Sequence, residues 1–231
     1  MVSTSKSESL SDSVQDYLKI IYELTEHGEA ASTTALAARL GITPASVTGM
    51  LQKLSSIEPA LVSYQKYQGV TLTPLGKRTA LEVIRHHRLI EAWLVRTLGY
   101  SWDEVHEEAD KLEHVISEDL ETRIAMALGD PQRDPHGEPI PNDHLIMPAD
   151  PSRPLASLSP RQEATVRRVH AGEPAFLRYL ETLGLIPGAC VKVLSVSPFD
   201  QVMRLQVGTQ KETLVLGPAI SGRVFVEIAS K

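Results

Sequence analysis

The chain has 231 residues, of which 42% are hydrophobic and 23% charged, as in an ordinary globular protein. It contains no apolar run near the ~18 residues that cross a bilayer, and its Ser-rich start lacks the apolar segment of a signal peptide. Its single cysteine, Cys190, excludes an intramolecular disulfide framework. We therefore expect a cytoplasmic protein without a membrane partner.

The net charge of −6 is distributed unevenly along the chain. Residues 32–78 carry five basic side chains against one acid, whereas residues 86–150 carry five basic side chains against fifteen acids. Only the basic part is suited to contact with nucleic-acid phosphates. A charged, solvated face without such a partner would give the same counts, so charge by itself favours neither interpretation.

The N-terminal part has the pattern of a helix-turn-helix with a wing. Apolar residues at helical spacing predict three helices, over 12–27, 35–40 and 45–54. The turn between the second and third helices contains Gly41, as is typical of this motif. Two strand-like runs follow, at 61–64 and 70–73, and predict a hairpin with Lys66 and Tyr67 at its tip.

Short side chains at the start of the third helix would let its backbone enter the major groove. Their hydroxyl and methyl groups can contact phosphates, base edges and thymine. Arg, Asn and Gln are absent from the first two turns, so we expect shape to matter more than bidentate base contacts. The predicted DNA-binding residues are Thr43, Ala45, Ser46, Thr48, Gly49, Lys53 and Lys66. A winged helix that contacts protein is the alternative.

The acidic part is predicted to form two long helices, over 77–98 and 102–128. Four metal-binding side chains of the second helix stand at i, i+4, i+7 and i+8, hence on one face: His106, Asp110, Glu113 and His114. His87 and Glu91 share a face of the first helix. Such a cluster of carboxylates would be stabilised by a divalent cation, although a solvated acidic face is the alternative.

The donor types indicate which metal and which chemistry to expect. Carboxylates with imidazoles and without thiolate suit Mn²⁺ or Fe²⁺ better than structural Zn²⁺. The HExxH motif is absent and no Ser-His-Asp order stands out, so we predict no catalytic residues.

The last hundred residues predict a linker and a small β domain. The stretch 130–160 holds eight of the fifteen prolines and no periodicity, so we expect a loop and linker. A short helix is predicted over 175–183. Strand-like runs at 191–196, 203–207, 213–216 and 223–228 indicate an SH3-like β-barrel.

Taken together, these motifs resemble the diphtheria toxin repressor family of metal-dependent regulators over nearly the whole chain. The resemblance is carried by Tyr17-Leu18 with Ile21–Leu24, Val47–Met50, Leu72–Gly76, His87–Glu91, Glu113–Ser117 and Pro135–Pro141. It implies a mainly α protein with small β parts and three domains. These are a winged helix-turn-helix DNA-binding domain at 1–76, a helical dimerisation and metal-binding domain at 77–150, and a linker plus SH3-like (FeoA-type) domain at 151–231.

The resemblance also implies two metal ions per subunit. The primary site maps onto Asp16, Asp110, Glu113 and His114. The ancillary site maps onto His87, Glu91 and His106, with Glu173 as the candidate from the C-terminal domain. Iron-sensing members carry Met and Cys where this chain has Asp16 and Asp110, whereas manganese-sensing members carry carboxylates there, so the resemblance favours Mn²⁺ over Fe²⁺.

We therefore predict a Mn²⁺-dependent repressor of metal-uptake genes that binds double-stranded operator DNA as a homodimer and has no small-molecule substrate. An Fe²⁺-dependent repressor of the same family is the nearest alternative. A metal-independent winged-helix regulator would bind DNA equally well in chelator. A metallohydrolase would need an open coordination position in a substrate pocket.

Overall fold

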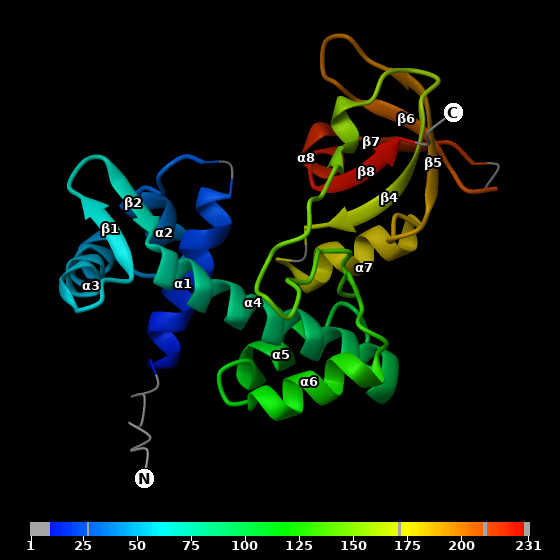
Figure 1. Ribbon diagram of the computed structural model, residues 1–231. Coiled ribbons are helices and arrows are strands. Elements are labelled where there is room, and N and C mark those ends of the chain that lie inside the picture. Colours follow the sequence, from blue (N-terminus) through cyan, green and yellow to red (C-terminus); the bar gives the residue numbers. More distant parts are fainter. Residues whose placement is uncertain (1–9, 27, 171, 210–211, 229–231) are drawn as a thin grey trace. The chain divides into compact units, whose positions relative to one another are not determined.

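The computed structural model describes residues 10–228 apart from 27, 171, 210 and 211 (Figure 1). The described residues form two compact units. The first contains the chain up to His86 together with Pro141–Ile146, and the second contains His87–Ile140 and the chain from Met147 onward. Among the described residues, none of the helices combines the length and the apolar character that a membrane span requires.

The first unit is a winged helix-turn-helix. It comprises α1 (Asp12–Thr25), α2 (Thr33–Leu40), α3 (Pro44–Ser56), β1 (Val62–Gln65), β2 (Gly69–Leu72) and the first part of α4 (Pro74–Trp93). One apolar core joins these elements, with Leu18, Leu36, Leu51 and Val70 fully buried. His27, where the sequence places the end of the first helix, lies outside the described residues.

Local capping explains where the two helices of the helix-turn-helix begin. The side chains of Ser32 and Thr43 each accept a backbone N–H from three residues further on, at 3.0 and 3.2 Å. Gly41 adopts φ 66 and ends α2 in the left-handed conformation that glycine favours. These contacts are local in sequence, which is why the sequence alone predicts the motif.

The long helix α4 begins at Pro74, earlier than the predicted Lys77. The side chain of Thr73 accepts the backbone N–H of Gly76 at 3.1 Å, and a proline is tolerated in the first turn. A π-helical turn, Leu94–Leu98, continues α4 to its end.

The single helix predicted over 102–128 is wrong. The chain forms two helices there, α5 (Val105–Leu112) and α6 (Glu118–Ala127). Ser117 starts α6 because its side-chain oxygen accepts the backbone N–H of Leu120 at 3.2 Å. Acidic residues fill the first turn of α6, where the helix dipole favours negative charge. A capping serine followed by acids is the local signal for this break.

The C-terminal part of the second unit is a small antiparallel sheet domain (Figure 1). Its elements are β3 (Arg153–Pro154), a 3-10 turn (Leu155–Ser157), β4 (Glu163–Val169), α7 (Pro174–Thr182), β5 (Cys190–Val196), β6 (Met203–Val207), β7 (Leu214–Leu216), α8 (Pro218–Ser221) and β8 (Val224–Ile228). The strand order is β3-β8-β4-β5-β6-β7. Strand β4 was not predicted, although Ala164, Val166 and Val169 point into the core.

The segment predicted as loop and linker contains an ordered loop, residues 134–138. The carboxylate of Asp134 accepts the backbone N–H groups of His136 and Glu138 at 2.8 and 2.9 Å. The carbonyl of His136 accepts the backbone N–H of Val169 in β4 at 2.9 Å. Gly137, at φ 88, lies against the carbonyl of Arg167. These contacts attach the loop to the C-terminal sheet.

Candidate metal centre

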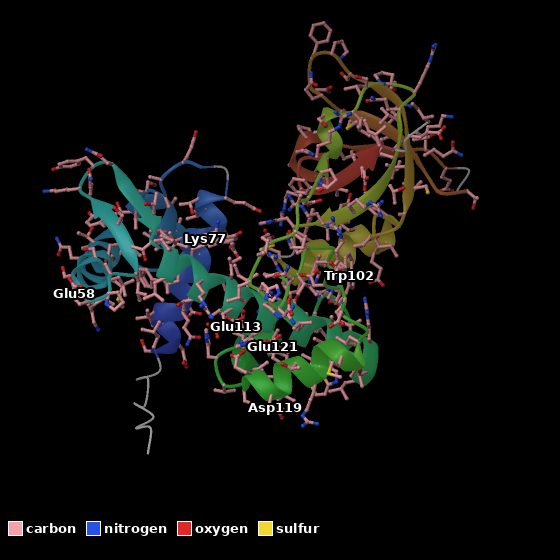
Figure 2. The ribbon with its side chains drawn as sticks, in the orientation of Figure 1. Glu58, Lys77, Trp102, Glu113, Asp119 and Glu121 are labelled. Carbon is pink, nitrogen blue, oxygen red and sulfur yellow. The ribbon has the colours of Figure 1, made fainter. Side chains whose placement is uncertain are left out.

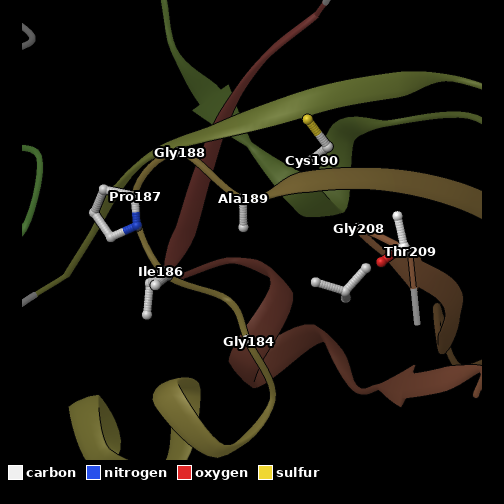
Figure 3. A pocket seen from close by; sticks show the side chains of 9 residues that line it. Gly184, Ile186, Pro187, Gly188, Ala189, Cys190, Gly208 and Thr209 are labelled. Atoms are coloured by element: carbon white, nitrogen blue, oxygen red, sulfur yellow. The ribbon is translucent and has the colours of Figure 1, made fainter.

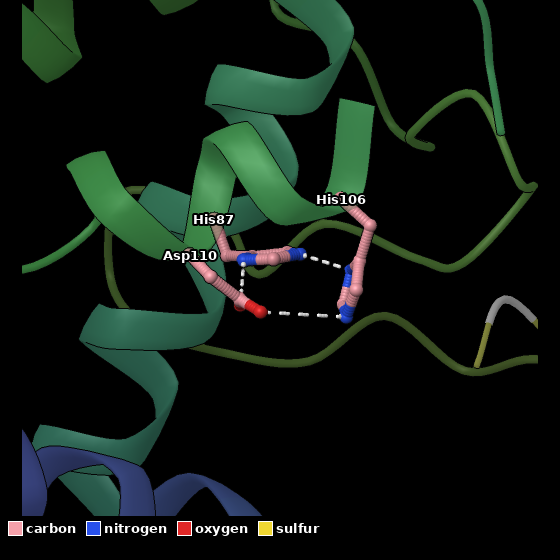
Figure 4. A group of neighbouring side chains, drawn as sticks. All are labelled: His87, His106 and Asp110. Atoms are coloured by element: carbon pink, nitrogen blue, oxygen red, sulfur yellow. Dashed lines mark hydrogen bonds and ion pairs between the residues drawn. The ribbon is translucent and has the colours of Figure 1, made fainter. Parts of the chain in front are cut away.

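Two helices of the second unit present imidazoles and carboxylates to each other. From α4 come His87 and Glu91, which are one turn apart and 5% and 1% exposed. From α5 come His106 and Asp110, also one turn apart. His87 and the two α5 side chains point toward one another (Figure 4).

Three donor atoms form a triangle at the centre of this group. His87 Nε2 lies 2.9 Å from both Glu91 Oε1 and His106 Nδ1, and those two atoms are 3.1 Å apart. The other ring nitrogen of His87 contacts Glu113 Oε2 and lies 3.2 Å from Asp110 Oδ1. An imidazole nitrogen carries at most one proton, so hydrogen bonds cannot satisfy all of these close pairs at once.

A divalent cation fits this donor set. Ligand atoms held at right angles, about 2.1 Å from one ion, are about 3 Å apart, which matches the spacing of the triangle. His87, His106 and Asp110 each offer a ligand atom, and these atoms lie within 4.8 Å of one another. The donors are imidazole nitrogens and carboxylate oxygens, the set that Mn²⁺ and Fe²⁺ accept.

A second group shares Glu91 with the first. Glu91, Asp134 and His136 are all buried, and their ligand atoms lie within 4.8 Å of one another. His136 Nδ1 lies 3.4 Å from Glu91 Oε2, and His136 Nε2 donates to the carbonyl of Trp102 at 2.6 Å. Because Nε2 is held by that carbonyl, Nδ1 is the ring atom that faces the carboxylates.

Trp102 links this second group to the C-terminal domain. Its indole ring stacks on the imidazole of His136 at a centroid distance of 5.9 Å and packs against the core of the C-terminal sheet. Trp102 is labelled in Figure 2. The orientation of His136 is therefore set by one aromatic face and one backbone carbonyl.

Burial and charge shift the pKa values of the second group in opposite directions. Burial raises the pKa of Glu91, but the charge of His87 and hydrogen bonds from His106, His136 and His87 bring it well below its usual range. Burial and the negative charge of Glu91 raise the pKa of Asp134 to about 7. Burial lowers the pKa of His136, but its contacts with Glu91 and Asp134 outweigh burial and raise it to about 9.

The predicted ancillary residues His87, Glu91 and His106 do come together. Of the predicted primary residues, Asp110 and Glu113 both contact His87, and His114 Nε2 lies 3.5 Å from Glu113 Oε1. Because α5 ends at Leu112, the expected shared helical face holds for His106 and Asp110 alone, while Glu113 and His114 follow the helix.

The other two predicted ligands come from other elements of the chain. Asp16 is half-buried on α1, within the first unit. Glu173 precedes α7, where its exposed carboxylate lies 3.3 Å from Arg223 Nη2. Among the described residues, none of the groups of imidazoles and carboxylates that could hold a metal ion includes Glu173.

Sequence reasoning missed Asp134 and His136 as candidate ligands. The stretch Pro135–Pro141 contributed to the family resemblance, but His136 stands far along the chain from the other clustered histidines. The available signal was an Asp-X-His-Gly motif inside a proline-rich stretch. Its burial depends on docking against β4, which no local pattern indicates.

The predicted DNA-binding residues lie at the accessible surface of the first unit. Those at the start of α3 and on its outer side are Thr43, Ala45, Ser46, Gly49 and Lys53, which are exposed, and Thr48, which is half-buried. Lys66 is exposed in the loop between β1 and β2. The N-terminal turn of α3 therefore presents short side chains to solvent.

A hollow of about 530 Å³ lies elsewhere in the second unit, in the C-terminal domain (Figure 3). It is lined by Gly184 and by residues 186–190 and 207–209. It shares no residue with the cluster of histidines and carboxylates.

Comparison with known proteins assigns all three parts of the chain. Residues 9–70 match the N-terminal DNA-binding domain of iron-dependent repressors, and residues 73–142 match their metal-binding and dimerisation domain. Residues 153–228 match the FeoA domain. The iron-dependent repressor IdeR of Mycobacterium leprae is 30% identical over 221 residues, which cover 89% of this chain and 93% of that protein. The chain belongs to the diphtheria toxin repressor family.

Solved structures agree with this assignment. A manganese-dependent transcriptional repressor in complex with manganese has a TM-score of 0.85 and 37% identity, covering 94% of this chain and 100% of that one. The manganese regulator SloR has a TM-score of 0.77 and 31% identity, covering 94% and 98%. The predicted fold class and family are confirmed. The protein is a metal-dependent transcriptional repressor of the diphtheria toxin repressor family, whose members are regulators rather than enzymes.

Proposed function

We propose that this repressor is activated by Mn²⁺ and binds operator DNA of metal-uptake genes as a homodimer. The observation that carries the proposal is the cluster of imidazole and carboxylate donors around His87, in which His87 and Glu91 are buried and His106 and Asp110 are more accessible. Carboxylate oxygens are hard donors that suit Mn²⁺, whereas sulfur donors suit softer ions. Manganese-dependent repressors are among the similar structures, and iron-dependent ones among the similar sequences.

We further propose two ions per subunit. One would be held by Asp16 with Asp110, Glu113 and His114, as the family resemblance implies. The other would be held by residues around Glu91, with His87 and His106 from one side or Asp134 and His136 from the other. We also propose that the three domains extend over residues 1–76 (DNA binding), 77–150 (dimerisation and metal binding) and 151–231 (linker and FeoA-type domain).

When bound, the ions would supply positive charge that relieves repulsion among the clustered carboxylates. Asp16 is the one proposed ligand from the DNA-binding unit, so it would connect α1 with the metal-binding domain. That connection would select the separation of the two recognition helices that fits successive half-sites, about 34–36 Å apart.

A mobility-shift assay on the promoter of a metal transporter tests the proposal. The full-length protein should bind in Mn²⁺, bind less tightly in Fe²⁺ under anaerobic conditions, and lose binding in EDTA. Asp16→Ala should lose the Mn²⁺ response while remaining a dimer. Asp12→Ala is the matched control, because Asp12 is an exposed acid on the same helix. Retention of the full response by Asp16→Ala would refute the role of Asp16.

The same assay separates the alternative functions. A stronger response to Fe²⁺ would identify an iron-sensing repressor, and equal binding in EDTA would identify a metal-independent regulator. Replacing both Asp16→Met and Asp110→Cys should shift the response toward Fe²⁺, because sulfur donors suit the softer ion.

A further inference from the structure

The tip of the wing holds a tyrosine in a backbone conformation that tyrosine does not favour. The backbone N–H of Gln68 donates to the carbonyl of Gln65 at 3.0 Å, which closes a four-residue turn. Tyr67 is the third residue of that turn and has φ 70. Turns with positive φ at this position favour Gly or Asn, because a Cβ atom crowds the backbone there.

The side chain of Tyr67 does not stabilise the fold by packing, because it is not buried. Tyr67 is 93% exposed. The ammonium group of the neighbouring Lys66 lies over its ring, 5.0 Å from the ring centroid. A large aromatic group held outward on a strained backbone indicates a binding role rather than a packing role.

The hairpin below this tip is firmly held. Strands β1 and β2 pair in register from Val62↔Leu72 to Gln65↔Gly69. Ala31 and Val70 exchange two backbone hydrogen bonds of 2.9 Å, so a third segment is added beside β2. A Cβ at Gly69 would lie 2.7 Å from the carbonyl oxygen of Ala31, which shows how closely the two segments pack.

The charge around the tip indicates the chemistry of the partner. From Leu61 to Arg78 the sequence contains Lys66, Lys77 and Arg78 and no acidic residue. Lys66 lies at the tip of the hairpin, and Lys77 and Arg78 lie in the first turns of α4. This positive charge, on a unit whose exposed α3 is suited to the major groove, matches a polyanionic partner rather than a cationic or an apolar one.

We propose that Tyr67 is a DNA-contacting residue that packs its ring against the deoxyribose edge of the operator minor groove, beside the major-groove segment that α3 enters. This inference rests on the proposed function of the first unit. The ring offers an apolar face to the sugar, and its hydroxyl can donate to a phosphate or to the acceptors of A·T pairs. Lys66, beside it, supplies a phosphate contact.

The backbone conformation of Tyr67 makes a sharp test possible. Tyr67→Gly removes the ring and suits the positive φ, so the unfolding midpoint should stay the same or rise. Operator affinity in Mn²⁺ should fall by about tenfold, which is at the lower end of the effect of losing an aromatic ring stacked on a base. Tyr67→Phe keeps the ring and should lose less.

Phe199→Gly is the matched control. Phe199 is 97% exposed in the C-terminal domain, so this change removes a similar aromatic surface and should leave operator affinity unchanged. In a hydroxyl-radical footprint, Tyr67→Gly should lose protection of the minor groove flanking the site while retaining the protection due to α3.

The outcomes distinguish this inference from the proposed function. If the wild-type protein shows no metal-dependent operator binding, the proposed function fails. If the wild type binds and Tyr67→Gly binds equally well with an unchanged footprint, the inference about Tyr67 is wrong and the exposed ring serves some other contact.

Discussion

Substitution of Gly137 tests whether the loop 134–138 is fixed by the C-terminal sheet. A Cβ atom at this position would lie 1.9 Å from the carbonyl oxygen of Arg167 and 2.8 Å from the Cα of Arg168. No rotamer relieves that overlap, because the opposing atoms belong to the backbone. Gly137→Ala must therefore move the loop or β4, and with it the hydrogen bond from Val169 N–H to the carbonyl of His136.

The size of the effect can be worked out from a matched glycine. Gly129 has φ 72 and would meet no atom within 4 Å, so Gly129→Ala should cost only the left-handed backbone energy, about 1–2 kcal/mol. Gly137→Ala has the same backbone energy at φ 88 and adds overpacking, about 1–3 kcal/mol. We expect a total of about 2–5 kcal/mol, part of which is the weakened Val169 bond.

Urea denaturation followed by tryptophan fluorescence measures both variants. The two tryptophans, Trp93 and Trp102, belong to the second unit, so the signal reports the unit that contains the loop. The measurement belongs in EDTA, since a bound ion would add its own stabilisation. Equal losses of unfolding free energy in Gly137→Ala and Gly129→Ala would refute the docking of the loop against Arg167.

Two predictions concern ionisation. Mn²⁺ affinity should rise between pH 6 and 8 with release of protons, measured by calorimetry in buffers of different ionisation enthalpy. The reason is that Asp134, with a pKa of about 7, and His136, with a pKa of about 9, must lose protons to bind a metal; a flat pH profile would contradict this. Arg178→Ala should cost about 0.5–1 kcal/mol at pH 7, because Arg178 donates to Asp103 at 2.7 Å and lowers its pKa. That loss should be present above the ordinary aspartate pKa and vanish as pH falls through the lowered one, which an acid-denaturation series would reveal.

Features set by neighbouring residues could be predicted from the sequence. The helix-turn-helix follows from Gly41, Thr43 and Pro44, whose effects act within one helical turn. The approach of His87 to Glu91 follows from i, i+4 spacing on a helix. Each of these predictions needs only the geometry of one element.

Features set by distant contacts could not be predicted in the same way. The break between α5 and α6 is a separate case: its signal, the capping Ser117, is local, but a continuous pattern of polar and apolar residues runs across it and favoured one long helix. The burial of His136 depends on Trp102 and on Val169 of β4, which are both more than thirty residues from it along the chain. Periodicity contains no information about which faces meet, and this is why Asp134 and His136 were missed.

The burial of the carboxylates decides between the two interpretations that charge alone left open. A solvated acidic face would keep its carboxylates in water, yet Glu91 and Glu113 are each 1% exposed and Asp134 is 8% exposed. Burying a carboxylate is unfavourable unless charge or hydrogen bonds compensate for it. Here the compensation comes largely from imidazoles, whose nitrogens bind either protons or metal ions. The acidic middle of the chain is therefore a site whose charge balance changes with metal, which is the property that a metal-dependent repressor requires.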